Sequence, residues 1–77
     1  MKELLEFLAG ELVDHPEAVK VTEVTDDRGL LLRLHVDPDD MGKVIGRGGR
    51  TARAIRSIVR AAATRRDVHA SVEIVED

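Results

Sequence analysis

Cysteine, tryptophan and tyrosine are absent from this chain of 77 residues, and Phe7 is its one aromatic side chain. The lack of cysteine excludes disulfide bonds, thiolate catalysis and cysteine-based zinc sites, and it is typical of proteins in a reducing compartment. The core must therefore be built from Leu, Ile, Val and Ala. Domains that bind nucleic acids by stacking bases on aromatic side chains, such as RNA-recognition motifs and OB-folds, are disfavoured.

The chain also lacks an apolar run long enough for a secretory leader or a membrane span. Residues 1–13 begin with a single basic residue, Lys2, and Glu3, Glu6 and Glu11 interrupt their apolar positions. We therefore expect a cytoplasmic protein. The length predicts a single small domain over residues 1–77, and so small a core leaves a domain only marginally stable, which favours oligomers.

Acidic residues are missing from one long stretch, residues 41–66, which contains eight basic side chains. The rest of the chain holds four basic side chains and all 15 acidic ones, and the net charge is −3. That net charge alone would argue against a nucleic-acid binder, but phosphate contacts depend on a local basic strip. The basic residues of the stretch are Lys43, Arg47, Arg50, Arg53, Arg56, Arg60, Arg65 and Arg66.

The first half of the chain predicts one helix followed by two strands. Leucines at helical spacing predict an amphipathic helix over about residues 2–14, and Pro16 follows its end. Valines between residues 19 and 24 indicate a strand, and the turn-forming residues 26–29 separate it from a second strand over residues 30–36. Alternation in the second strand predicts three core residues: Leu32, Leu34 and Val36.

The second half predicts two helices and a last strand, which gives an α+β fold with the order α-β-β-α-α-β. Pro38, Asp39 and Asp40 offer an N-cap for a short helix that ends near Ile45. A longer helix over about residues 50–65 has an apolar side formed by Ala52, Ile55, Val59 and Ala62, and an arginine side formed by Arg50, Arg53, Arg56 and Arg60. The last strand is predicted from alternating apolar residues: Val68, Ala70, Val72 and Ile74.

The two helices of this second half are joined by Gly46-Arg47-Gly48-Gly49, a Gly-x-x-Gly turn. Glycines let a backbone approach phosphates closely, and the N–H groups that open the next helix attract anions. The turn therefore favours contact with RNA or single-stranded DNA. The alternative is a plain connector in which Gly46 only caps a helix. Phosphate-binding P-loop and dinucleotide fingerprints are absent, so nucleotide hydrolysis is not indicated.

This element order, with the glycine turn in this position, resembles the type II, prokaryotic KH domain. The resemblance rests on residues 40–51, Asp-Met-Gly-Lys-Val-Ile-Gly-Arg-Gly-Gly-Arg-Thr, on Ala54-Ile55-Arg56, and on Asp14-His15-Pro16-Glu17-Ala18. Its small size makes the chain similar to the bacterial stand-alone KH proteins of the KhpA, or YlqC, family. The resemblance implies a three-stranded sheet packed on one face by three helices.

The resemblance also implies a function in binding short single-stranded RNA. Members of the family dimerise, many pair with a second KH protein of the KhpB (Jag or EloR) type, and they are associated with RNA chaperone activity, post-transcriptional regulation and cell elongation or division. The groove would lie between the glycine turn and the edge of the second strand. The residues implied to bind RNA are Lys43, Val44, Ile45, Gly46, Arg47, Gly48, Gly49, Arg50 and Arg53.

Two residues depart from the family pattern. Ala52 stands where KH domains favour a large apolar side chain, which predicts shallower packing in the groove. Gly48 stands where relatives often carry a polar or basic side chain, so Arg47 is the only cation of the turn. The additional glycine predicts a more flexible turn that costs ordering entropy on binding.

Other features are interpreted more simply. Small residues on the long helix predict a homodimer interface, with burial in the core as the alternative, at Ala54, Ile58 and Ala61. The three histidines, His15, His35 and His69, lack metal-ligand spacing and are interpreted as surface or capping residues. No catalytic residue, metal or cofactor is expected, so the chain is predicted not to be an enzyme. A protein-interaction adaptor and a ribosome-associated factor remain the alternatives to RNA binding.

Overall fold

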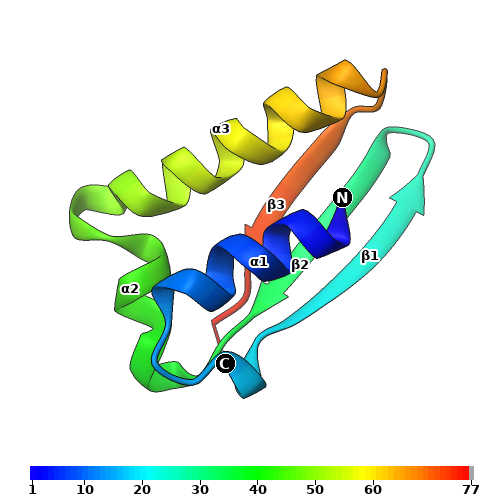
Figure 1. Cartoon of the computed structure of the whole chain (residues 1–77). Helices are drawn as coiled ribbons and strands as arrows, with labels where there is room; N and C mark the ends of the chain where they lie inside the picture. The colour runs from blue at the N-terminus through cyan, green and yellow to red at the C-terminus, as the bar shows by residue number, and fades with distance from the viewer. Residues whose placement is uncertain (77) are drawn as a thin grey trace.

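A computed structural model of the chain describes residues 1–76 (Figure 1). The predicted order α-β-β-α-α-β is confirmed, although the first helix ends two residues before the predicted boundary. Short 3-10 turns lie at Pro16–Ala18, Pro38–Asp40 and Arg47–Gly49. The helices and strands are α1 (Lys2–Leu12), β1 (Lys20–Asp26), β2 (Gly29–His35), α2 (Met41–Ile45), α3 (Arg50–Arg65) and β3 (Ala70–Ile74).

The three strands form one mixed sheet in the order β1-β2-β3. β1 pairs with β2 antiparallel, and β2 pairs with β3 in parallel, so β2 is central and both of its edges are occupied. The free edges of the sheet are those of β1 and β3. The prediction that the edge of the second strand forms a wall of the groove is therefore wrong, because that edge is hydrogen-bonded to β3.

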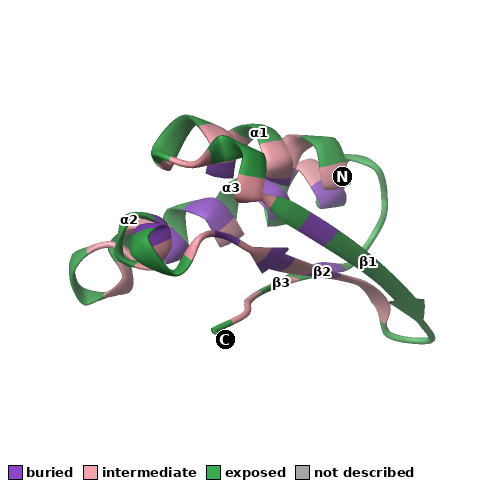
Figure 2. Ribbon diagram, turned by 90° about the horizontal axis from the view of Figure 1, so that it is seen from below, coloured by how far each residue is buried: buried purple, intermediate pink, exposed green. Residues whose placement is uncertain are grey.

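The helices cover one face of the sheet, as predicted, and leave the other face open (Figure 2). A parallel pair of strands requires a long crossover connection. Here α2, the glycine turn and α3 together make that crossover from β2 to β3. The glycine turn is thus held by two helices that the topology fixes against the sheet.

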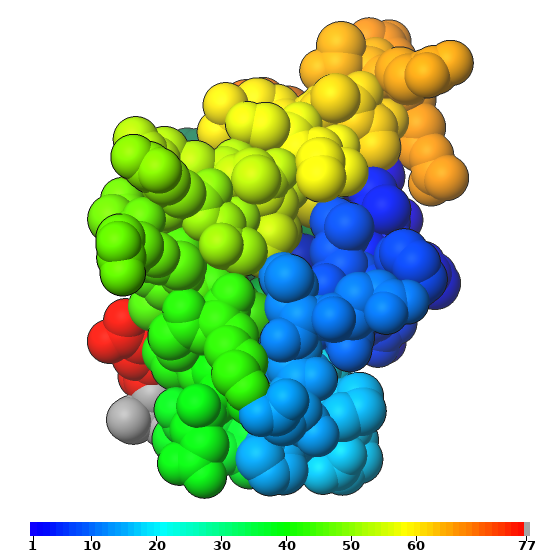
Figure 3. All heavy atoms as spheres, turned by 60° about the vertical axis from the view of Figure 1, so that its left-hand side comes forward, coloured from blue at the N-terminus to red at the C-terminus, as the bar shows by residue number. Residues whose placement is uncertain are grey.

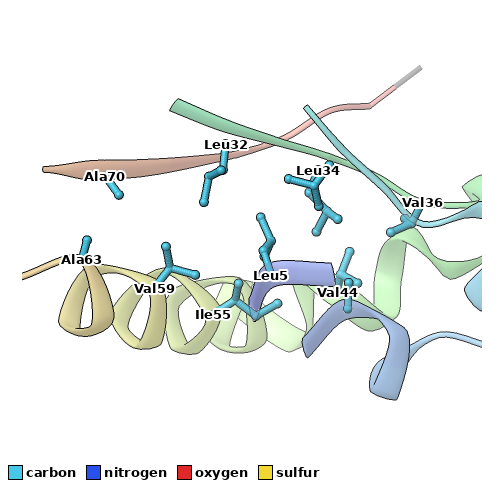
Figure 4. Packing of buried hydrophobic residues seen from close by; sticks show 11 residues of the cluster. Leu5, Leu32, Leu34, Val36, Val44, Ile55, Val59, Ala63 and Ala70 are labelled. Carbon is cyan, nitrogen blue, oxygen red and sulfur yellow. The ribbon is translucent and has the colours of Figure 1, made fainter. Parts of the chain in front are cut away.

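The core lies between the helical layer and the covered face of the sheet (Figure 4). Leu32, Leu34 and Val36 are buried, as the alternation of the second strand predicts. Leu5 of α1 and Val59 of α3 are fully buried against them. Aliphatic side chains thus fill the interior without any aromatic ring, and Phe7 is 62% exposed.

Two details at the end of α3 differ from the prediction. Ala63 is buried where Ala62 was expected, because the buried positions Ala52, Ile55, Val59 and Ala63 keep close to the helical period. Val68 does not belong to the last strand. Its N–H donates to the Ala63 carbonyl at 2.9 Å and Asp67 has φ 59°, so this segment closes the helix as a Schellman motif and β3 begins at Ala70.

Candidate nucleic-acid interface

The backbone of the glycine turn has positive φ angles, which residues other than glycine rarely adopt. Gly46, Gly48 and Gly49 have φ angles of 75°, 65° and 78°. The Gly49 N–H donates to the Gly46 carbonyl at 3.1 Å, and this bond closes the turn. Figure 1 shows the turn at one end of the molecule, where it joins α2 to α3.

The glycines of the turn are needed for different reasons. A Cβ at Gly46 would overlap the Thr51 hydroxyl and lie 2.8 Å from the Thr51 backbone nitrogen, so this position allows α3 to start close to the end of α2. A Cβ at Gly48 or Gly49 would meet no atom within 4 Å. The space beside these two glycines is therefore free of protein atoms within residues 1–76, so a phosphate can approach their backbone closely.

Arg53, which the sequence places among the RNA-binding residues, contacts the turn itself. Its Nη2 donates to the carbonyl oxygen of Gly48 at 3.1 Å. The contact joins the first turns of α3 to the glycine turn. Arg53 thus restrains the turn with one nitrogen, while its other N–H groups have no hydrogen-bond partner among residues 1–76 and can bind an anion.

Arg47 lies in the turn and Arg50 follows it directly, and both side chains are exposed. Within residues 1–76 neither arginine forms an ion pair, since the salt bridges of this region involve only Lys43 among the basic residues of α2 and α3. Arg47 directly precedes Gly48 and Arg50 directly follows Gly49 in the chain. Two exposed cations therefore flank these two glycines.

Lys43, by contrast, is engaged by two carboxylates. Its ammonium is paired with Asp14, in the segment after α1, and lies 3.8 Å from Oδ1 of Asp40. The hydrogen bond to Asp14 raises the pKa of Lys43. The structure therefore does not leave this cation unpaired beside the turn.

The two apolar residues before the turn differ in burial. The Val44 side chain is fully buried in the core, whereas Ile45 is partly exposed. The prediction that the Val44 side chain lines a nucleotide groove is wrong, because helical geometry turns this residue of α2 toward the sheet (Figure 4). Ile45 remains accessible next to Gly46.

Asp40 has a role that the sequence did not indicate. Its carboxylate is 1% exposed, and its Oδ2 lies 3.0 Å from both the backbone nitrogen and the Nδ1 atom of His15. The sequence predicted that Asp40 offers a cap for its own helix. Its carboxylate instead binds the segment after α1. The capping carboxylate is that of Asp37, whose Oδ1 accepts from the Asp39 N–H at 2.9 Å.

Arg56 connects α3 to the free edge of the sheet. Its Nε donates to the carbonyl oxygen of Val72 at 3.3 Å in a partly buried contact. The sequence identified Arg56 only as part of the arginine side of the helix, because the edge position of Val72 depends on strand order. This contact places the arginine side of α3 next to β3.

An apolar hollow of about 280 Å³ lies between α1 and α3. Figure 3 shows the blue N-terminal segment directly beside the yellow-green atoms of α3. Ala54, Ile58 and Ala61 are all exposed, so the alternative of core burial for these residues is wrong. The hollow is lined by Phe7, Leu8, Glu11, Leu12, Thr51, Ala54, Ile55 and Ile58.

Two features are absent from residues 1–76: a cluster of metal-binding side chains and a helix that could cross a membrane. No group of three or more His, Asp or Glu side chains is arranged to hold a metal ion. No helix in this range has both the length and the apolar character needed to cross a bilayer. The features that remain are the glycine turn, the arginines of α3 and the apolar hollow.

Comparison with known proteins identifies the family. The sequence model of the KhpA/KhpB KH domain matches residues 2–74, which include all six elements and the glycine turn. The chain belongs to the KhpA/KhpB KH-domain family. The resemblance drawn from residues 40–51 is therefore confirmed.

Relatives that match the chain over nearly its whole length are named RNA-binding protein KhpA. The protein from Clostridium perfringens is 52% identical over 75 residues, which cover 97% of this chain and 100% of the relative. The KhpA protein from Halalkalibacterium halodurans is 51% identical over 76 residues, or 99% of this chain and 100% of its own length. The KhpA protein of Clostridium acetobutylicum is 51% identical over 75 residues, with 97% and 100% covered.

Proposed function

We propose that this KhpA-family chain is an RNA-binding protein of the cytoplasm in which residues 1–77 act as one KH domain. Short single-stranded RNA would lie across the glycine turn. The observation that carries the proposal is the open backbone at Gly48 and Gly49, flanked by the exposed cations of Arg47 and Arg50. The names of its relatives as RNA-binding proteins support the same conclusion.

Binding would be dominated by the backbone of the RNA. N–H groups at the start of α3 and the guanidinium groups of Arg47 and Arg50 would hold the phosphates, while Ile45 would contact a base. Stacking contributes little because the one aromatic side chain, Phe7, lies in the hollow at α1. We therefore expect modest affinity that falls steeply with salt concentration.

The proposal is tested by fluorescence anisotropy with labelled single-stranded RNA. The variant Arg47→Asp/Gly48→Asp places two negative charges in the turn, and the open space at Gly48 accommodates the new side chain. The control, Arg65→Asp/Arg66→Ser at the far end of α3, changes the net charge by the same three units. Loss of binding in the turn variant alone supports the proposal. Equal binding by both variants would leave the adaptor function as the better interpretation.

A second copy of the chain, or a KhpB-like partner, would compensate for the weak binding of one domain. Two linked domains raise the effective concentration of the second site. The exposed apolar side chains of Phe7 and Ile58, 62% and 46% exposed, support an interface along α1 and α3. From the family resemblance we further propose that such dimers act as RNA chaperones or post-transcriptional regulators linked to cell elongation and division.

The interface is tested with Ala61→Glu, which introduces a charge beside Ile58 on the exposed side of α3. We expect a monomer in sedimentation velocity and an unchanged circular dichroism spectrum. The matched control is Thr64→Glu, one turn closer to the end of α3 and also exposed. A wild-type protein that sediments as a monomer at all concentrations would refute the homodimer.

A further inference from the structure

Arg56 occupies a position that the proposed phosphate contacts do not explain. It is the member of the arginine side that is partly buried, whereas Arg50, Arg53 and Arg60 are exposed. Its Nε is held by the Val72 carbonyl at 3.3 Å. An arginine that only met phosphates would be expected at the exposed rim, as Arg47 and Arg50 are.

The location of Arg56 is within reach of RNA that crosses the glycine turn. Arg56 follows Gly49 by seven residues, which is about 10 Å along the axis of α3. Arg53, three residues earlier on the same side of the helix, contacts Gly48. A strand held at the turn and extended over a few nucleotides would therefore pass along this side of α3, beside the free edge of β3.

The contact with Val72 leaves the outer end of the guanidinium available. Arginine has five N–H donors, of which the Nε bond uses one. Within residues 1–76, no hydrogen bond or ion pair engages the two terminal nitrogens of Arg56. The anchored Nε fixes the direction of the planar group, so less side-chain entropy is lost when these terminal nitrogens bind a ligand.

We propose that Arg56 is a specificity-determining residue that reads guanine in the bound RNA. Guanine offers two adjacent acceptors, O6 and N7, that match the two terminal nitrogens of arginine, and single-stranded RNA exposes this edge of the base. The inference rests on the proposed function of RNA binding. It adds that the domain prefers a guanine where the RNA passes Arg56, beside the free edge of β3.

The test uses octamers of uridine with a single central guanosine, compared with the same octamers that carry 7-deazaguanosine, which lacks the N7 acceptor. Wild-type protein is expected to bind the guanosine octamer about tenfold more tightly. Arg56→Met removes the guanidinium donors, so it is expected to bind both octamers equally. Arg60→Met, at an exposed position one turn further along α3, should retain the discrimination.

The possible results separate the inference from the proposed function. If the wild type binds both octamers equally, Arg56 does not read guanine although RNA binding stands. If Arg56→Met weakens binding to all sequences alike and lowers the salt slope by about one, Arg56 contacts a phosphate and the inference is wrong. If the wild type binds no RNA, the proposed function fails as well. Should Arg56→Met unfold, the comparison of the two octamers with the wild type still decides whether N7 of guanine is recognised.

Discussion

The imidazole Nδ1 and the backbone nitrogen of His15 both lie 3.0 Å from one oxygen of the buried Asp40 carboxylate. His15 belongs to the segment between α1 and β1, whereas Asp40 directly precedes α2. The second carboxylate oxygen lies 3.8 Å from the Lys43 ammonium. This cluster therefore fixes the start of α2, and with it the glycine turn, to the end of α1.

The His15–Asp40 contact predicts a pH-dependent stability. The hydrogen bond to Asp40, opposed by desolvation and assisted by the nearby charge of Asp37, raises the pKa of His15. Protonated His15 is thus favoured in the folded chain. The stabilisation that protonated His15 gives to the fold is complete below about pH 6.5, the ordinary pKa of histidine. It is lost as the pH rises through the raised pKa.

Burial raises the pKa of Asp40, but the hydrogen bond from the His15 side chain and those from backbone N–H groups outweigh it, so the net pKa is lowered. The contribution of the Asp40 carboxylate to the stability of the fold is therefore present above about pH 4. It is lost only as the pH falls through the lowered pKa. The other charges that face this pair are those of Asp14, Glu17 and Lys43.

The measurement is the melting temperature of the wild type and of His15→Gln between pH 5 and pH 9. We expect the difference between the two to be largest below pH 6.5 and to shrink at higher pH. His69→Gln is the control because, within residues 1–76, its ring forms no hydrogen bond. A difference that stays constant over the whole range would show that protonation of His15 does not contribute.

Gly46→Ala is predicted to destabilise the fold by roughly 1–3 kcal/mol from its positive φ angle alone. Overlap of the new Cβ with Thr51 adds to this cost. Gly10→Ala is the matched control, since a Cβ there meets no atom within 4 Å and Gly10 lies inside α1. That control should gain about 0.5–1 kcal/mol from helix propensity. Urea unfolding measures both, and a neutral Gly46→Ala would contradict the geometry of the turn.

Arg53→Met is predicted to loosen the glycine turn without unfolding the protein. The lost hydrogen bond to the Gly48 carbonyl, about 0.5–1.5 kcal/mol, should speed exchange of the Gly49 amide by about twofold to tenfold. Arg50→Met removes the same charge next to the turn, but Arg50 forms no hydrogen bond with its side chain among residues 1–76. Native-state hydrogen exchange should therefore respond to Arg53→Met and not to Arg50→Met. Equal protection in both variants would exclude a positioning role for Arg53.

Asp14→Asn is predicted to strengthen RNA binding at low salt by up to about fivefold, the size of an exposed ion pair. The substitution releases Lys43 from its closest partner and increases the positive potential near the turn. Glu23→Gln, an exposed residue of β1, removes one negative charge elsewhere as the control. The comparison is made by anisotropy at two salt concentrations. An equal gain in both variants would indicate an effect of net charge and not of Lys43.

Local patterns predicted most of the fold. The leucine spacing, the alternation of residues 30–36 and the arginine side of the long helix all depend on residues close together in the chain, and each gave the correct element. The predictions that failed concern partners that are distant in sequence. Val44 is buried beneath the sheet and Asp40 binds His15, which lies 25 residues away. Neither partner could be identified from spacing along the chain.

The sequence by itself determined the α+β order, the glycine turn, the separation of charges and the family. Those properties follow from backbone preferences and periodicity, which act over a few residues. The tertiary structure decided which sheet edge is free and that Arg56 meets Val72. It also decided that Lys43 is paired with a carboxylate, whereas Arg47 and Arg50 have no such partner among residues 1–76. Strand order and packing set these relationships, because each depends on which distant segments the folded chain brings within hydrogen-bonding distance.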